Sequence, residues 1–351
     1  MLHAWLAAWW AEQGAEREFH VVTVFRGDAL VGALPLEISS RGPIRVARVP
    51  GPPMALSDLL ARPHDADAVC DAIVRAIDAL PLHVVDIDGV AAESLLATVL
   101  GRHGRVRTAP GLVAPTLSMP DGFDAAWRAA TSSKTRNTQS RRFRQLSDTG
   151  EATWSLHSTP ETVAAALPDA YRLHHLRWEG RRDAVGYEDL SPFGRAELRP
   201  FHLRALTGMA AGGHVRLLEL RLDGVPIAFH LYLLVGTTVV VYRLAFDPDF
   251  SRFSPGLLTT LEALRRASDE GATSVEFLRG VERYKMELAD RADPLVRVTG
   301  LARTPRGSLF AAGAIGTTRL RSRLRQSARV RGMVRRARTT VARLRPGRAR
   351  A

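Results

Sequence analysis

The stretch from Tyr242 to Lys285 constrains the fold of this chain more than any other. It reads as an apolar strand, a loop rich in Asp, Ser, Pro and Gly, a helix, a second strand and a second loop. A tight loop between strand and helix places the first backbone N–H groups of the helix at the end of the strand, facing outward. The stretch therefore predicts a place to hold an anionic ligand.

The charge of the chain is concentrated at its C-terminal end. The 351 residues are 46% apolar, which is enough for two domains or one large one. The formal net charge is +13, but the last acidic residue is Asp293, and sixteen arginines lie from Arg297 to Arg350. The body is therefore near neutral, and the basic character belongs to the tail.

The cysteine content and the apolar runs limit the compartment and the class of protein. The single cysteine, Cys70, excludes a disulfide framework, favours a reducing compartment, and is expected to be a small buried hydrophobe on a helix. The N-terminus predicts an amphipathic helix with Trp5 and Trp9 one turn apart rather than a signal peptide. The uncharged run from Val225 to Tyr242 approaches transmembrane length, but Pro226 and the β-branched residues favour two buried strands joined by a turn.

The two halves of the chain follow the same plan. A hairpin with a Gly27-Asp28 turn opens the first half, and a hairpin with an Asp223-Gly224 turn recurs in the second, each followed by helix and strand. One continuous helix is predicted from Phe123 to the Gly150 break. This order predicts an α+β (mixed α/β) fold of two tandem modules, each a mixed, mainly antiparallel sheet flanked by helices. The expected limits are a degenerate first module at 1–120, a second module with the active site at 121–305, and an Arg-rich tail, helical or disordered, at 306–351.

An ordered set of short motifs carries a family resemblance over most of the chain. The motifs are LVGALPL, the Ser57-Asp58 pair, VVDIDGV, SSKTRN with Arg141-Arg142, HHLRW, LDGVPIAFHL, AFDPDFSRFSPGLL and FLRGVERYK. With them the chain resembles the GNAT-superfamily acetyltransferases assigned to cellulose biosynthesis in bacteria, the CelD/BcsL type, which are similar in plan to the Fem-type aminoacyl-tRNA-dependent transferases. The usual Gly-rich pyrophosphate signature is not present in its standard form, and the first module begins late.

The resemblance implies acyl transfer from acetyl-CoA or another acyl-CoA to an amine or hydroxyl, with no metal. Under it, the loop before the helix becomes a cradle for the CoA pyrophosphate, because it offers hydroxyls, a cation and free N–H groups. Ser-Pro-Gly at a helix start also fits a plain helix cap. The cradle is predicted to comprise Ser251, Arg252, Ser254, Pro255, Gly256, Leu257 and Leu258.

Three residues beside the cradle are candidates for proton transfer. Asp247 is the candidate base for the acceptor, although an Asp in a DPD turn also serves as a loop cap. Tyr242 and Tyr284 are candidates to protonate the leaving thiolate, although a tyrosine on a strand or loop is often simply packed. The acceptor pocket is expected to involve Asp58, His174, Trp178, Arg279 and Lys285. A solvated basic loop is the alternative interpretation for Arg279 and Lys285.

The two basic segments of the sequence are compatible with several kinds of binding partner. The helix with Lys134, Arg136, Arg141, Arg142 and Arg144 either binds phosphates or is a solvated face. The tail fits an anionic membrane surface through a narrow stripe that includes Val330 and Val334, nucleic acid such as tRNA, or no partner. Three hypotheses follow: a cytoplasmic acyl-CoA acyltransferase acting on a cell-envelope or polysaccharide-related metabolite, peripheral at the inner face of the membrane; a Fem-like transferase that uses charged tRNA; and a non-catalytic scaffold of a polysaccharide synthesis complex.

Overall fold

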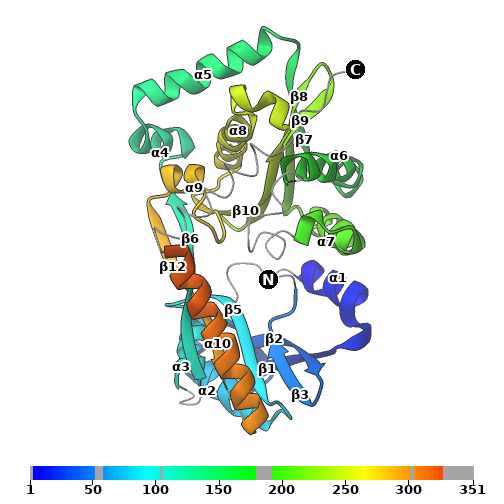
Figure 1. Ribbon diagram of the computed structural model, residues 1–351, viewed down its shortest axis with the longest axis vertical. Coiled ribbons are helices and arrows are strands. Elements are labelled where there is room, and N and C mark those ends of the chain that lie inside the picture. Colours follow the sequence, from blue (N-terminus) through cyan, green and yellow to red (C-terminus); the bar gives the residue numbers. More distant parts are fainter. Residues whose placement is uncertain (1–2, 52–57, 103–105, 179–191, 301–303, 327–351) are drawn as a thin grey trace, which may run out of the picture.

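A computed structural model describes residues 3–51, 58–102, 106–178, 192–300 and 304–326 (Figure 1). The first half of the chain (blue to cyan) lies below the second half (green to yellow), and one sheet runs through both. The helices are α1 (His3–Gln13), α2 (Ala66–Ala79), α3 (Leu95–Arg102), α4 (Phe123–Ala130), α5 (Ser133–Ser147), α6 (Pro160–Trp178), α7 (Arg199–Ala211), α8 (Pro255–Asp269), α9 (Arg283–Leu288) and α10 (Pro305–Gln326).

The sheet is mixed and mainly antiparallel, which confirms the predicted fold class. Only the β3–β5 and β10–β11 pairs are parallel among the described strands. Across the sheet the order is β1 (Glu18–Arg26), β2 (Ala29–Arg41), β3 (Ile44–Arg48), β5 (Val84–Ala91), β12 (Arg291–Gly300), β6 (Val106–Ser118), β11 (Ser274–Glu276), β10 (Thr238–Phe246), β9 (Val225–Val235), β8 (Val215–Leu222) and β7 (Ala152–His157), with the short β4 (Leu60–Ala61) beside β2.

Both predicted hairpins are present. Gly27 has φ 58° in the turn between β1 and β2, and Asp223 and Gly224 have φ 49° and 78° between β8 and β9. Two positive φ values in a two-residue turn match the right-handed twist of the flanking strands. The run from Val225 to Tyr242 forms β9 and the start of β10, both largely buried, as expected. Within the described residues, no helix is long and apolar enough to cross a membrane.

The last strand of the second half lies inside the first. β12 pairs with β5 on one side and with β6 on the other, so residues 291–300 complete the sheet of the N-terminal half. Buried Asp86 on β5 holds β12 in place. Its carboxylate accepts hydrogen bonds from Arg297 Nε at 2.7 Å and Arg297 Nη2 at 2.9 Å. Arg48 Nη2 on β3 donates to the same carboxylate at 3.1 Å. The limits 1–120, 121–305 and 306–351 remain predictions.

Helix α1 contacts both halves of the chain. Trp5 and Trp9 are both buried, as the sequence pattern indicates, and both rings pack edge-on against Phe201 of α7. The indole Nε1 of Trp9 donates to Glu37 Oε2 on β2 at 2.5 Å. The N-terminal helix thus contacts the second half through its apolar side and the first half through a buried hydrogen bond. Cys70 is buried in α2, as predicted.

The prediction of one helix from Phe123 to Gly150 is wrong. The chain forms α4 and α5, separated at Thr131 and Ser132, which adopt extended backbone angles. The Ser132 hydroxyl accepts from Thr135 N–H at 3.2 Å, so Ser132 caps a new helix. The valine stripe of the tail lies outside the described residues, whereas α10 runs along the lower half in Figure 1.

Candidate functional site

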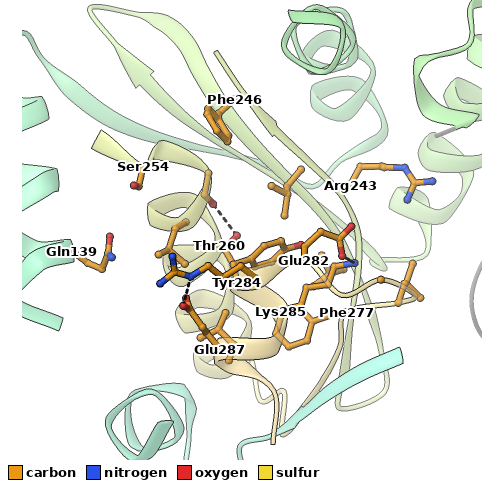
Figure 2. Close-up of a pocket in the computed structure, with 18 of the residues that line it drawn as sticks. Gln139, Arg243, Phe246, Ser254, Thr260, Phe277, Glu282, Tyr284, Lys285 and Glu287 are labelled. Atoms are coloured by element: carbon orange, nitrogen blue, oxygen red, sulfur yellow. Dashed lines mark hydrogen bonds and ion pairs between the residues drawn. The ribbon is translucent and has the colours of Figure 1, made fainter. Parts of the chain in front are cut away.

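A cleft opens where strands β10 and β11 part. The two strands pair only from Thr238–Val240 to Ser274–Glu276. Beyond that point β10 continues along β9 to Phe246, whereas the chain after Glu276 follows β6, where Phe277 N–H donates to Pro115 O at 3.0 Å. The space between the diverging segments is a cleft of about 950 Å³ (Figure 2).

The N-terminus of α8 reaches this cleft. The 3-10 helix η7 (Pro248–Phe253) leads into Ser254, whose φ of 54° turns the chain, and Pro255 is the first helical residue. The Ser254 hydroxyl makes no capping hydrogen bond. The plain helix-cap interpretation therefore does not account for this hydroxyl, which lines the cleft together with Gly256 and Leu257 at the positive end of the helix dipole.

Most of the other residues predicted for the cradle do not line the cleft. Ser251 lines the cleft, but Arg252, Pro255 and Leu258 are not among its lining residues. Pro255 and Leu258 are buried, and the Arg252 guanidinium lies 4.5 Å from the ring centre of neighbouring Phe253. The structure thus brings part of the predicted set to one surface, and the binding role stays a prediction.

Gly256 is required by packing rather than by ligand approach alone. A Cβ on this residue would lie 2.7 Å from Cδ1 of Phe246, closer than side chains tolerate. We expect Gly256→Ala to displace the Phe246 ring and to destabilise the protein by about 1–3 kcal/mol, the usual cost of overpacking. Urea unfolding checks this, with Gly313→Ala as the control, because its Cβ would meet nothing within 4 Å. If Gly256→Ala/Phe246→Leu is no more stable than Gly256→Ala, the steric explanation is wrong.

The structure places Asp247 in a capping role. Its Oδ1 accepts from the Asp249 N–H at 3.0 Å at the start of η7, and the residue is not among those that line the cleft. Asp58 also lies elsewhere: its Oδ1 accepts from the Leu96 N–H at 2.8 Å, near the start of α3 in the first half. Neither carboxylate is brought to the cleft, so the loop-cap alternative describes Asp247 better.

The two tyrosines differ in their surroundings. Tyr242 lines the cleft but is buried, with its ring edge-on to Trp5 and its hydroxyl 2.8 Å from His202 Nε2. Burial raises its pKa to about 12. Tyr284, half-buried, lies near the middle of the cleft in Figure 2, edge-on to Phe277. Tyr284 is therefore the better placed of the two to donate a proton to a leaving group.

The predicted acceptor residues are only partly together. His174 on α6 is buried at the cleft wall, and burial, with Arg243 nearby, lowers its pKa to about 3, so it is neutral. Trp178 ends α6, and its side chain lies outside the described part of the structure. Arg279 and Lys285 both line the cleft, and Arg279 Nη1 pairs with Asp88 Oδ2 at 3.1 Å.

The solvated-loop interpretation is wrong for Lys285. Its residue is 7% exposed and lies in α9, where Nζ donates to the Arg279 carbonyl oxygen at 3.1 Å and pairs with Glu282 Oε2 at 3.0 Å. Burial lowers the pKa of this amine, and the Glu282 carboxylate partly offsets the effect. Leu278, just before this segment, has φ 55°, an unusual angle for a bulky residue that marks a conformation fixed by its surroundings.

Several cleft residues escaped sequence reasoning. Glu282 lines the cleft within the stretch from Tyr242 to Lys285, and Glu287 lines it just after that stretch, but the basic residues around them drew attention away from both. Arg243 follows Tyr242 at a register shift in β10, which a strand pattern does not reveal. On α4–α5, one polar stripe faces the cleft at helical spacing, a signal that the sequence did contain: Ser132, Thr135, Gln139 and Arg142. No group of three metal-binding side chains occurs among the described residues.

Comparison with known proteins relates the part of the chain around the cleft to a known family. Residues 133–286, a little under half of the chain, match the family model described as an acetyltransferase (GNAT) domain. No curated protein matches the chain. The crystal structure of FemX superposes with a TM-score of 0.60 at 11% identity, covering 84% of this chain and 90% of that one.

Two further solved structures share the fold. L-PGS from Bacillus licheniformis gives a TM-score of 0.55 at 11% identity, covering 88% of this chain and 95% of that one. The C-terminal domain of a putative lysylphosphatidylglycerol synthetase from Agrobacterium fabrum gives 0.52 at 11% identity, with 85% and 88% covered. At such identities the likeness concerns the fold, while the family match runs from α5 into α9 and covers most of the residues that line the cleft. The chain therefore carries an acetyltransferase domain of the GNAT type over residues 133–286.

Proposed function

We propose that the chain transfers an acyl group, acetyl in the simplest case, from acyl-CoA to an amine or hydroxyl of a cell-envelope or polysaccharide-related metabolite. One observation carries the proposal: β10 and β11 part beside the N-terminus of α8, so that a cleft and an anion-binding helix end share one surface. An acyl-CoA needs this combination, because its pyrophosphate is anionic and its acyl arm is narrow and extended.

The register shift in β10 supplies the next part of the argument. Val241 and Arg243 lie opposite Tyr232 and Leu231, so Tyr242 is an extra residue without a partner in β9. A bulge of this kind frees backbone groups from the ladder. Val241 to Leu244 all line the cleft, and we assign to their backbone N–H groups the stabilisation of the oxyanion that forms when the acceptor attacks the thioester carbonyl.

Two side chains of the segment after β11, on the side of the cleft opposite β10, would transfer the protons. Glu282, whose side chain is 42% exposed, takes the proton that the attacking amine or hydroxyl must lose. Tyr284 gives its hydroxyl proton to the CoA thiolate as the carbon–sulfur bond breaks. Glu282 thus replaces Asp247 as the candidate base, because it lines the cleft and Asp247 does not.

Leu257 allows a test of the cradle with a matched control. Leu257 is the third helical residue of α8, three positions after Ser254, where a glutamate suits the helix terminus. Leu257→Glu should therefore fold but repel the pyrophosphate, weakening acetyl-CoA binding about ten-fold or more relative to Leu257→Gln, since 1.4 kcal/mol corresponds to ten-fold. Isothermal titration measures both. Equal dissociation constants for the two variants would mean that the phosphates bind elsewhere.

A second function is favoured by the fold comparison. FemX and L-PGS share the overall fold, which supports transfer of an aminoacyl group from charged tRNA as the alternative. Helix α5 would then be an RNA contact, because Lys134, Arg141 and Arg144 are all exposed. Salt-sensitive tRNA binding without acetyl-CoA binding would favour this alternative, and tight acetyl-CoA binding without tRNA binding would count against it.

A further inference from the structure

The cleft carries more positive charge than its own acids balance. Its described lining includes six basic residues (Arg142, Arg177, Arg243, Arg279, Arg283 and Lys285) and two acidic ones (Glu282 and Glu287). Arg283 pairs with Glu287 at 2.6 Å and Lys285 with Glu282 at 3.0 Å. Arg279 pairs with Asp88 at 3.1 Å. Arg142 and Arg243 line the cleft too, and neither forms an ion pair within the described part of the chain, so their charge is available to anionic ligands.

The cations divide into two groups by position. Arg142 belongs to α5, which packs against η7 and therefore lies on the side of the α8 N-terminus. Arg243 extends from β10 on the other side: in Figure 2 it lies across the cleft from Ser254 and Gln139. A phosphate held at the α8 N-terminus would leave Arg243 for a different anion.

The surroundings of Arg243 leave part of its guanidinium unsatisfied. Nη1 donates to the Tyr242 carbonyl oxygen at 2.6 Å, and the group lies 4.6 Å from the Tyr242 ring centre. Its Nε is buried without a hydrogen-bond partner, and within the described ranges Arg243 forms no ion pair with a carboxylate. Arg243 as a whole is half-buried, and a partly desolvated cation with one unsatisfied buried donor is stabilised by an anion.

Two neighbours strengthen the positive potential at this point. Arg279 and Lys285 lie close enough that the charge of Arg279 lowers the pKa of Arg243 and the charge of Arg243 lowers that of Lys285, after the larger effect of burial in each case. His174 also lines the cleft, and because burial lowers its pKa to about 3 its imidazole is neutral. Glu282 lines the same cleft, and its charge acts on Arg243 in the opposite direction, so the proposed base lies within electrostatic reach of the anion binder.

We propose that the acceptor carries an anionic group, a carboxylate or a phosphate, which Arg243 binds beside the reacting amine or hydroxyl. The proposal rests on the proposed function, since it names the class of acceptor for the same cleft. It assigns to Arg243 the recognition of the acceptor and leaves the CoA phosphates to the α8 N-terminus.

The test uses small probes that differ only in the anionic group. Phosphoethanolamine is compared with ethanolamine, and 4-aminobutyrate with butylamine, each titrated into the CoA-saturated full-length protein and followed by ligand-observed NMR, so that no turnover is needed. Wild type, Arg243→Met and Arg243→Lys are measured, with Arg265→Met as a control for loss of a cation outside the cleft lining. Acetyl-CoA is titrated into each variant in parallel.

The wild type should bind phosphoethanolamine and 4-aminobutyrate about 10- to 100-fold more tightly than the matched amines that lack the anionic group, the contribution of a charge-assisted hydrogen bond. Arg243→Met should abolish that preference, Arg243→Lys should restore part of it, and acetyl-CoA affinity should stay the same in all variants. Equal binding of the probes with and without the anionic group, or a preference that survives in Arg243→Met, would overturn the proposal. So would a parallel loss of acetyl-CoA affinity, because Arg243 would then serve CoA. Failure of the wild type to bind acetyl-CoA would count against the proposed function, and the probe titrations repeated without CoA would still decide the role of Arg243.

Discussion

Glu282→Gln should lower kcat for acetyl transfer by about 10²- to 10⁴-fold, the range that general-base catalysis contributes. The amide keeps the size of the side chain but cannot accept the proton of the attacking group. Acetyl-CoA binding should be nearly unchanged, because the helix end that holds the phosphates is not touched. The measurement is release of free CoA at saturating acceptor, using an acceptor identified from a panel of amines and alcohols.

Glu287 provides the matched control for this experiment. It lines the same cleft, belongs to the same short segment, and is ion-paired with Arg283 as Glu282 is with Lys285. Glu287→Gln should change kcat by less than about 10-fold, as expected for a side chain that does not transfer a proton. The reverse pattern would assign the base to Glu287.

Asp86→Ala should reduce the free energy of unfolding by about 3–5 kcal/mol, as expected when one partner of a buried ion pair is removed. The substitution leaves Arg297 and Arg48 without their shared carboxylate and loosens the strand that the second half contributes to the first. Urea unfolding followed by circular dichroism measures the loss. Asp88→Asn is the control on the same strand, because the side chain of Asp88 is 46% exposed and its pair with Arg279 should contribute less than about 1 kcal/mol.

The contribution of Asp86 should also depend on pH in a defined direction. Burial alone raises the pKa of a carboxyl group, but the hydrogen bonds and charges of Arg297 and Arg48 prevail and lower the pKa of Asp86 below 3.8. The folded state therefore binds this proton less readily than the unfolded state, so the stabilisation is present above about pH 4 and is lost as the pH falls further. The stability difference between wild type and Asp86→Asn should shrink in that acid range. A difference that stays constant would show that the charge of Asp86 does not contribute.

Local patterns predicted the second half of the fold well. The Asp223-Gly224 turn, the paired apolar strands after it and the Pro255 helix start are all set by near neighbours in sequence. The insertion of β12 between β5 and β6 was not predictable in this way, because it joins residues about two hundred positions apart through Asp86 and Arg297. The break at Ser132 was missed because the residues on both sides favour helix, and a hydroxyl cap decided the outcome.

The candidate site was predictable as a region but not residue by residue. The stretch from Tyr242 to Lys285 does supply both walls of the cleft, since Ser254, Tyr284 and Lys285 all line it. Asp247 was a candidate base because it follows a strand, with a loop cap as the alternative; side-chain direction depends on the Asp249 turn, which position alone does not show. Arg243 was passed over because its importance comes from the bulge and from missing partners, which only the assembled sheet reveals.

Hydrogen exchange with and without acetyl-CoA tests the central claim most directly. If the cleft between β10 and β11 holds acyl-CoA with its phosphates at the α8 N-terminus, protection should appear in peptides covering Ser254–Leu258 and Val241–Leu244. Peptides covering α3, whose N-terminus is already capped by Asp58, should show no change. Protection confined to other segments, or none at saturating acetyl-CoA, would contradict the account.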